Sequence, residues 1–408
     1  MCYGKIDATY EIVGDWRPTS TMPIAVIVLF LGAFCVGTTE FVIAGLLPEI
    51  SLDLNISIPT AGYLITAYAL GVAIGGPVLT LAIAKFSRKR NLLFLLLIFL
   101  AGHLWCANSS SYEMLMAGRL IIALSHGSYF GVAGVVAVSI VPVERRGAAI
   151  AWLFAGISVA NILGVPGGTA IGNWLGWRAT FWIVGAAACF VIAAIYWFVP
   201  QDESDAAERP GVGAQITAIA NQKVMLAYLT FAVMLIGFWT YFTFVAPHMI
   251  EVGRVPKESI AFMLFLFGVG ATLGTAIGGR LADRVPEMTL RFGLPAQVLA
   301  MSAIYLFSFD PISMAVLLFL AGTIMFIPAS SIVNRILQGA SSAPDFASTL
   351  VSTAANIGIA FGAILGAQIL TSGVGYSQLP GVGAAFIAMA SFVMLLSIRL
   401  ERQRQIRG

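Results

Sequence analysis

The sequence predicts an all-α membrane protein, with twelve transmembrane helices arranged as two pseudo-symmetric six-helix bundles. First, 59% of the 408 residues are hydrophobic and only 10% are charged, whereas soluble domains usually carry about 25% charged residues. Second, the apolar residues fall into twelve runs, each close to the roughly 20 residues that cross the hydrocarbon layer of a membrane. Third, the longest polar connection divides these runs into six and six.

The twelve runs follow one another with short polar connections. The first run lacks the short apolar core and small-residue cleavage site of a signal peptide, so we expect it to be retained as a span. The boundary between the ninth and tenth spans depends on "FDP" at 309–311. In chain order, the predicted spans are residues 22–47, 60–83, 91–108, 114–140, 147–171, 179–199, 224–247, 259–279, 292–309, 311–333, 346–371 and 380–398.

The basic residues predict how the chain is oriented. Cytoplasmic loops collect Lys and Arg, and an even number of spans places both termini on one side. All but four of the 22 Lys and Arg residues lie on that side; the exceptions are Arg119, within a span, and Arg178, Arg254 and Lys257 in opposite loops. Both termini are therefore predicted to be cytoplasmic. The "RKR" at 88–90 then anchors this topology, and we expect no nucleic-acid partner.

The connection "PQDESDAAERPGVGAQITAIANQK" between the sixth and seventh spans separates two halves. The halves share a weak repeat, because "VANILG" and "AANIGI" place Asn161 and Asn356 at comparable points of the fifth and eleventh spans. Parallel repeats of this kind build a common transporter architecture, with a site between the halves. The predicted domains are an N-terminal segment 1–21, a bundle 22–199, a linker 200–223, a bundle 224–398 and a tail 399–408.

Glycines spaced four apart occur in every third span. Small residues one turn apart let helix backbones approach closely in lipid. We expect these four helices to make a sliding surface between the halves, although glycine is also generally enriched in membrane helices. The series are Gly71 and Gly75; Gly164, Gly168 and Gly172; Gly270, Gly274 and Gly278; and Gly358, Gly362 and Gly366.

Four stretches of the sequence are typical of one known family. They are "GTTEFVIAGLLPEI" in the first span, "GYLITAYALGVAIGGPVLT" in the second, "GRLIIALSHGSYFGV" in the fourth and "GVPGGTAIGNWLGWRATFW" entering the sixth. On these, the chain resembles the drug:proton antiporter branch of the major facilitator superfamily, and in particular bacterial sugar-efflux permeases of the arabinose-efflux type. The resemblance covers nearly the whole chain after residue 22, and it implies a multi-pass protein of the bacterial inner membrane.

The resemblance also implies roles for particular residues. The arginine of the fourth span serves proton coupling in that branch, and here it is Arg119. The Gly/Pro-rich stretch of the fifth span is associated with antiport, and here it comprises Gly164, Pro166, Gly167 and Gly168.

A cytoplasmic loop motif of the superfamily is only partly kept. After the second span, "TLAIAKFSRKR" has Ala84 where the family has Asp, and only the basic end, with Lys85 and Arg88, remains. Its counterpart after the eighth span, "GRLADR", keeps Asp283 and Arg284. These four charged residues are the candidate gating loops.

Glu40 is the one acidic residue within a predicted span. A carboxylate in lipid costs several kcal/mol, so we expect it to be functional, or else structural and paired to a neighbouring helix. Glu40 and Arg119 lie about 10 Å and 8 Å from the predicted outer ends of their spans, and His126 lies on nearly the same helix face as Arg119. We therefore expect these three residues to share a cavity, where small movements of Arg119 would switch Glu40 between its charged and neutral forms. His126 has a coupling role, a substrate role or a structural one.

Several polar and aromatic side chains within spans are candidates for the substrate cavity. The "GFWTYFTF" stretch at 237–244 offers rings for stacking on a ring-shaped substrate, although lipid-facing aromatics give the same pattern. The intramembrane amides either bind substrate or tie helices together. The candidates are Tyr68, Asn161, Trp239, Tyr241 and Asn356.

These observations predict a secondary transporter, a proton-coupled antiporter that exports small organic molecules such as sugars or drugs. A uniporter or a proton-coupled importer of the same fold is the nearest alternative, and a membrane-embedded receptor or enzyme is a distant one. The sequence has no G-K-[ST], G-x-S-x-G or H-E-x-x-H motif, which disfavours an ATP-driven pump and an intramembrane hydrolase. We expect a monomer in the lipid bilayer, with protons and a small molecule as partners and with no cofactor or metal.

Overall fold

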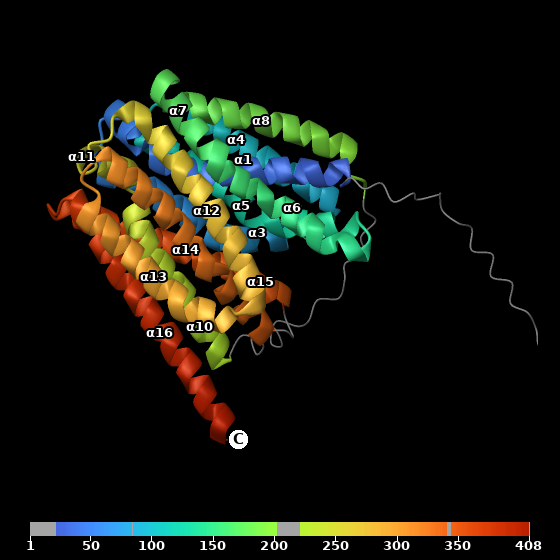
Figure 1. Cartoon of the computed structure of the whole chain (residues 1–408). Helices are drawn as coiled ribbons and strands as arrows, with labels where there is room; N and C mark the ends of the chain where they lie inside the picture. The colour runs from blue at the N-terminus through green and yellow to red at the C-terminus, as the bar shows by residue number, and fades with distance from the viewer. Residues whose placement is uncertain (1–21, 84, 202–220, 341–343, 408) are drawn as a thin grey trace, which may run out of the picture.

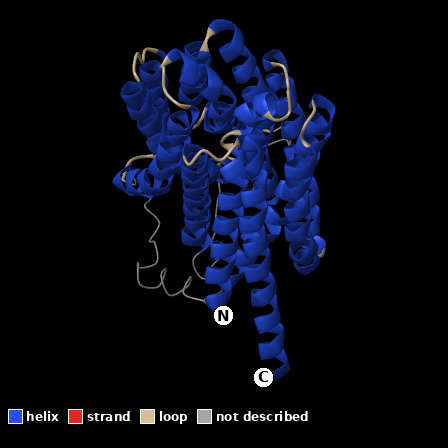
Figure 2. Cartoon of the chain, turned by 90° about the vertical axis from the view of Figure 1, so that its left-hand side faces the viewer, coloured by secondary structure: helices blue, strands red, loops and turns tan. Residues whose placement is uncertain are grey.

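The computed structural model describes residues 22–83, 85–201, 221–340 and 344–407. In these ranges it contains twelve helical spans that are long and apolar enough to cross a membrane. Figure 2 shows these helices side by side, and the described part of the chain contains no strand. The all-α fold class is confirmed. The predicted segment 1–21, most of the linker 200–223 and Ala84 lie outside the described residues.

The N-terminal half forms the blue-to-green group of helices in Figure 1. Two of its spans are interrupted by one π-helical turn each, so that α2, η1 and α3 make one span, as do η2, α6, η3 and α7. Single π-turns inside α-helices are frequent at functional sites. The elements are α1 (Ile24–Asp53), α2 (Ile58–Leu70), η1 (Gly71–Gly75), α3 (Gly76–Ile83), α4 (Arg88–Ala107), α5 (Tyr112–Ser139), η2 (Val143–Arg145), α6 (Arg146–Val159), η3 (Ala160–Gly164), α7 (Val165–Leu175) and α8 (Trp177–Phe198).

The C-terminal half forms the yellow-to-red group in Figure 1. Its seventh span breaks after Phe242, and a short helix follows at the same end of the bundle. The elements are α10 (Gln222–Phe242), α11 (Val245–Glu251), η4 (Lys257–Ser259), α12 (Ile260–Arg284), α13 (Pro286–Phe307), α14 (Pro311–Gly339), α15 (Pro344–Thr371), η5 (Tyr376–Gln378) and α16 (Leu379–Arg407).

Several helices are longer than hydropathy alone predicts. α1 continues six residues past its predicted end at 47, through Pro48 to Asp53. α13 begins at Pro286 instead of 292. The division at 309–311 is confirmed, since the side chain of Asp310 accepts hydrogen bonds from the first backbone N–H groups of α14. Hydrogen bonds from Ser313 hold the pKa of this exposed carboxyl below its usual value.

The spaced glycines do not lie between the halves, so the expected sliding surface is wrong. A Cβ on Gly75 would meet Leu124 of α5, and one on Gly168 would meet Val42 of α1. The C-terminal half repeats this pattern, because the series of α12 faces α14 and the series of α15 faces α10. In the N-terminal half the second span faces the fourth, and the fifth faces the first. In the C-terminal half the eighth span faces the tenth, and the eleventh faces the seventh. Glycine therefore brings backbones together inside each half, and the repeat itself is confirmed.

The two halves touch along other faces of the same helices. α2 and η1 pack against α15, α7 and η3 pack against α12, and α1 contacts α11. The backbones come close at Gly268, where a Cβ would meet the main-chain carbonyl of Asn161. Near the end of α1, Gly45 approaches Leu264, and Gly62 of α2 approaches Phe244. The named contacts between the halves thus run from the middle of the bundle to the end where α1 finishes.

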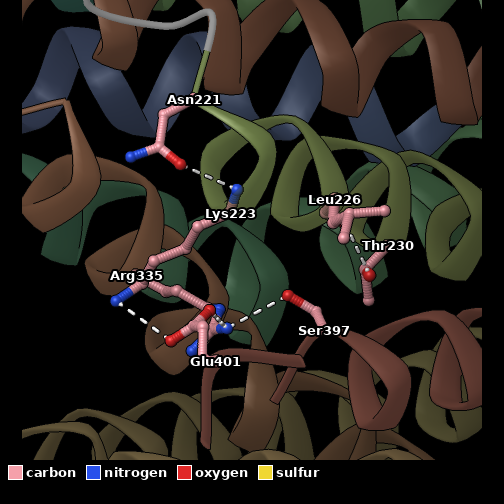
Figure 3. Close-up of polar contacts among 7 residues, drawn as sticks. All are labelled: Asn221, Lys223, Leu226, Thr230, Arg335, Ser397 and Glu401. Carbon is pink, nitrogen blue, oxygen red and sulfur yellow. Dashed lines mark hydrogen bonds and ion pairs between the residues drawn. The ribbon is translucent and has the colours of Figure 1, made fainter. Parts of the chain in front are cut away.

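An ion-pair network ties three helices of the C-terminal half together at the opposite end. Figure 3 shows Glu401 of α16 between Arg335 of α14 and Lys223 of α10. The carboxylate of Glu401 accepts a hydrogen bond from Arg335, and its second oxygen lies 3.4 Å from Nζ of Lys223. Arg335 also donates to Ser397, at 3.1 Å. This half is therefore braced at the end where α10 begins and α16 finishes.

Candidate functional site

Arg119 is fully buried in the N-terminal half, on α5. Its Nη1 donates a hydrogen bond of 2.9 Å to the main-chain carbonyl of Thr39 on α1. Its Nε and Nη2 have no hydrogen-bond partner. Among the described residues no carboxylate lies within 4.0 Å of the guanidinium. A buried cation in this state is costly, and it attracts any anion that can reach it.

Two side chains, Tyr68 and His126, connect Arg119 to Glu40. The guanidinium carbon of Arg119 lies 3.9 Å from the centre of the Tyr68 ring, a cation–π contact. The hydroxyl of Tyr68 is 2.9 Å from Nδ1 of His126. The other ring nitrogen, Nε2, lies 4.0 Å from Oε2 of Glu40. Four side chains from α1, α2 and α5 therefore meet in one cluster, which we call the Glu40 cluster: Glu40, Tyr68, Arg119 and His126.

The cluster is almost closed to solvent. The side chains of His126 and Glu40 are 7% and 14% exposed, so Glu40 is the most accessible member of the cluster. Tyr68 is buried as well. Solvent therefore reaches the cluster mainly at the Glu40 carboxylate.

Thr39 is held in place by a histidine of α4. Nδ1 of His103 donates to the carbonyl of Phe99 at 2.8 Å, and its Nε2 lies 3.0 Å from the Thr39 hydroxyl, which is also 2.9 Å from the carbonyl of Cys35 within α1. These contacts hold the stretch of α1 whose carbonyl receives Arg119. These contacts favour a structural role for His103 in positioning Thr39.

Sequence reasoning anticipated the meeting of Glu40, Arg119 and His126, but not its geometry. Glu40 lies about 20 Å from the end of α1 and Arg119 about 10 Å from the start of α5, instead of the predicted distances of about 10 Å and 8 Å. The reason is that α1 extends past the predicted end. Arg119 contacts the main chain of α1 beside Glu40, and it is His126 that approaches the carboxylate.

The other predicted substrate-cavity residues do not gather around Tyr68. Trp239 stacks on Phe41, the neighbour of Glu40, with ring centres 5.7 Å apart, so it lies at the boundary between the halves. Tyr241, two residues further on, points to another side of α10, where its ring meets His248 at 5.1 Å. The Tyr241 hydroxyl and both ring nitrogens of His248 have no partner, and burial lowers the pKa of His248 to about 4.

The two predicted asparagines lie on different interfaces. Asn161 belongs to the π-turn η3, and its main-chain carbonyl faces Gly268 of the other half. Asn356 donates to the carbonyl of Ser352 within α15, while its Oδ1 is buried without a partner.

The predicted antiport stretch lies where η3 passes into α7. Gly164 packs against Thr38 and Gly168 against Val42, both on α1 next to Glu40. Pro166 is buried in the first turn of α7, and Gly167 faces open space. This stretch therefore supports the part of α1 that carries the carboxylate.

The four candidate gating residues lie between α3 and α4, at the start of α4, and at the end of α12. Lys85 lies over the ring of Phe86 at 5.4 Å, and Arg88 begins α4. Asp283 and Arg284 are exposed at the end of α12. Among the described residues, Lys85, Asp283 and Arg284 form no ion pair.

The sequence did not reveal an ion pair that connects the two halves. Nζ of Lys257, in η4, lies 2.5 Å from Oε1 of Glu49 on α1, and the main-chain carbonyl of Lys257 accepts from the Asn173 side chain at 3.4 Å. We call this group the Lys257 latch. The available signal was charge position, because Lys257 is one of the few basic residues outside the predicted cytoplasmic side.

Comparison with known proteins places this geometry in a family. A profile of the Major Facilitator Superfamily matches residues 29–363. The inner membrane transport protein YdhP of Escherichia coli K12 is 35% identical, and the match covers 91% of this chain and 95% of YdhP. The chloramphenicol resistance protein of Streptomyces lividans is 32% identical over 86% of this chain and 90% of its own length. The transporter AraJ of Escherichia coli K12 is 31% identical over 92% and 95%.

A solved structure has the same fold. It is the crystal structure of a bacterial homologue of the human lysosomal transporter Spinster, in an inward-facing and unoccupied conformation. It is 18% identical, has a TM-score of 0.71, and the match covers 93% of this chain and 98% of that one.

Proposed function

Because this chain belongs to the Major Facilitator Superfamily and is a membrane transporter rather than an enzyme, we propose that it is a proton-coupled antiporter that exports small organic molecules. The observation that carries the proposal is the Glu40 cluster: a partly accessible carboxylate in the middle of a span, beside a histidine and near a buried arginine that has no anion. An intramembrane ionisable residue is by default a functional candidate.

The cluster supports a proton cycle centred on Glu40. When Glu40 is ionised, the nearby Arg119 charge is partly balanced. When Glu40 takes a proton, Arg119 is left uncompensated, and the arrangement of α1 against α5 loses part of its stabilisation. Protonation therefore changes the relative free energies of two arrangements of the halves, as a coupling ion must.

The membrane potential provides enough energy for export. About 100 mV supplies roughly 2.3 kcal/mol for each proton that enters. One-to-one exchange then maintains about a fortyfold outward gradient of a neutral substrate. No nucleotide-driven step is needed.

The substrate we propose is an uncharged molecule with a ring and hydroxyl groups. The Phe41–Trp239 stack lies between the halves beside Glu40, and an aromatic face binds both drug rings and the apolar faces of sugars. The name of the Streptomyces relative points to chloramphenicol, and the resemblance of the sequence to sugar-efflux permeases points to pentoses. Both belong in the first screen.

We place both termini in the cytoplasm, on the basic side of the chain. The Lys257 latch then closes the outer end of the bundle, and the Glu40 cluster is reached from the cytoplasm. Labelling a cysteine introduced at exposed Leu52, at the end of α1, from outside intact cells tests this orientation.

Transport by purified protein in vesicles with an acidic lumen tests the function. The wild-type protein should accumulate chloramphenicol or a pentose in the lumen while the pH gradient lasts. Glu40→Gln keeps the shape of the side chain in its neutral form, so it should lose accumulation and keep exchange of substrate for substrate. Equal accumulation by Glu40→Gln contradicts the proposal.

A uniporter of the same fold is the alternative. It predicts that the wild-type protein equilibrates substrate at the same rate with and without the pH gradient. A proton-coupled importer would respond to a gradient of the opposite sign.

A further inference from the structure

Tyr68 is buried between Arg119 and His126. The guanidinium carbon of Arg119 lies 3.9 Å from the centre of the Tyr68 ring. The Tyr68 hydroxyl lies 2.9 Å from Nδ1 of His126. Tyr68 is 2% exposed, which leaves little surface for a substrate to touch. Among the described residues, His126 is the single hydrogen-bond partner of this hydroxyl.

The direction of this hydrogen bond follows from the requirement that the buried hydroxyl proton of Tyr68 has an acceptor. If Nδ1 of His126 were the donor, the hydroxyl proton of Tyr68 would have no acceptor. If the hydroxyl donates instead, its proton is satisfied and Nδ1 supplies a lone pair. A neutral imidazole then carries its hydrogen on Nε2, the nitrogen 4.0 Å from Oε2 of Glu40.

A donor that faces a carboxylate stabilises its ionised form. The charged and titratable groups around His126 are Glu40 from α1, Tyr68 from α2, Arg119 on α5 itself, and His103 and Cys106 on α4 beyond Arg119. Of these, Tyr68 is hydrogen-bonded to the imidazole ring. The choice of tautomer therefore depends on one hydroxyl group.

We propose that Tyr68 is a positioning residue for proton coupling: its hydroxyl fixes the His126 tautomer that presents Nε2–H to Glu40, and thereby sets the pH at which Glu40 takes its proton. This inference rests on the proposed function, in which Glu40 is the proton carrier. It replaces the role in the substrate cavity predicted for Tyr68 from the sequence.

Infrared titration of the protein in lipid tests the inference without any substrate. The carboxylic-acid C=O band that disappears in Glu40→Gln reports the protonation of Glu40. Tyr68→Phe keeps the ring under Arg119 and removes the hydroxyl alone, so the tautomer is no longer fixed. We expect the midpoint of the Glu40 band to move to higher pH by up to about half to one unit, because a donor 4.0 Å from Oε2 no longer stabilises the carboxylate.

Tyr129→Phe is the matched control. Tyr129 is also fully buried in the N-terminal half, and its hydroxyl donates at 2.9 Å to the carbonyl of Leu29, which does not titrate. This variant loses a hydroxyl of the same kind, and its Glu40 band should titrate as in the wild type. The thermal midpoints of Tyr68→Phe and Tyr129→Phe are measured to check that both variants are folded.

A second titration separates positioning from a direct effect. In a His126→Phe background the Tyr68 hydroxyl has no imidazole to orient, so adding Tyr68→Phe should move the midpoint no further. A full shift in that background overturns the inference, as does a Tyr68→Phe midpoint equal to the wild type. If the wild-type protein shows no titrating band that Glu40→Gln removes, the proposed function fails instead.

Discussion

A single buried cation, Arg119, dominates the electrostatics of the N-terminal half. It has one hydrogen bond, to the carbonyl of Thr39, and two N–H groups without a partner. Residues held in such costly states are retained for function more often than for stability. The resemblance to a known family implied its role, but sequence spacing did not reveal that Tyr68 lies beneath it.

Arg119→Met separates function from stability. The substitution removes a buried charge and keeps an apolar side chain of similar length, and replacing buried charges in this way is often neutral or stabilising. We expect a thermal midpoint that is unchanged or raised by about 2–4 °C, together with loss of pH-driven transport. A structural role for Arg119 predicts a lower midpoint.

Gly274 tests the corrected role of the spaced glycines. A Cβ at this position would meet the backbone of Thr323 on α14, within the same half. Gly274→Ala should therefore destabilise the protein by about 1–3 kcal/mol, measured as a lower thermal midpoint. Gly279→Ala is the control on the same helix, because a Cβ there meets nothing within 4 Å. A midpoint equal to that of the wild type would contradict this packing role.

At the scale of helices, the Lys257 latch is the polar connection between α1, α7 and the start of α12. Lys257 is 46% exposed and Glu49 16%, so the pair contributes up to about 1 kcal/mol. That is enough to change the ratio of two conformations about fivefold.

Charge reversal tests the latch. Glu49→Lys should favour the conformation in which this end is open, and Glu49→Lys combined with Lys257→Glu should restore the closed one. Spin labels on exposed Leu52 and Glu258 report the distance between the halves. Equal distance distributions in all three proteins would show that the pair has no part in closure.

Helix existence was predictable from hydropathy, while helix contacts were not. Twelve apolar runs gave twelve spans, since a membrane core admits few other structures. The polar end of α1, from Pro48 to Asp53, gave no hydropathy signal, so the helix end was placed too early. The glycine period identified which helices pack closely, but a period does not specify the neighbour, and each series faces its own half.

At the scale of the molecule, the two halves are bundles that meet where α2 and η1 pack against α15 and where α7 and η3 pack against α12. Glycines pack the helices tightly inside each half, and the Glu401 network braces one of them. Between the halves, glycines such as Gly62 and Gly268 face groups of the other half, and the Phe41–Trp239 stack lies there as well. A surface of this kind can separate and close again while each bundle keeps its packing, as alternating access requires.

The position of the Glu40 cluster fits this division. Its four members belong to the N-terminal half alone, so it can bind a proton without help from the C-terminal half. Phe41, the neighbour of Glu40, contacts Trp239 across the boundary. The proposed protonation of Glu40 would therefore act on the arrangement of the halves through α1.

Proton release on substrate binding tests the central claim most directly. In an antiporter that uses Glu40, substrate and proton compete, so adding substrate to weakly buffered protein near neutral pH should release protons. We predict release of up to about one proton per bound substrate from the wild type and none from Glu40→Gln at equal occupancy. Equal release from both proteins, or saturating substrate binding to the wild type without release at any pH, would contradict the account.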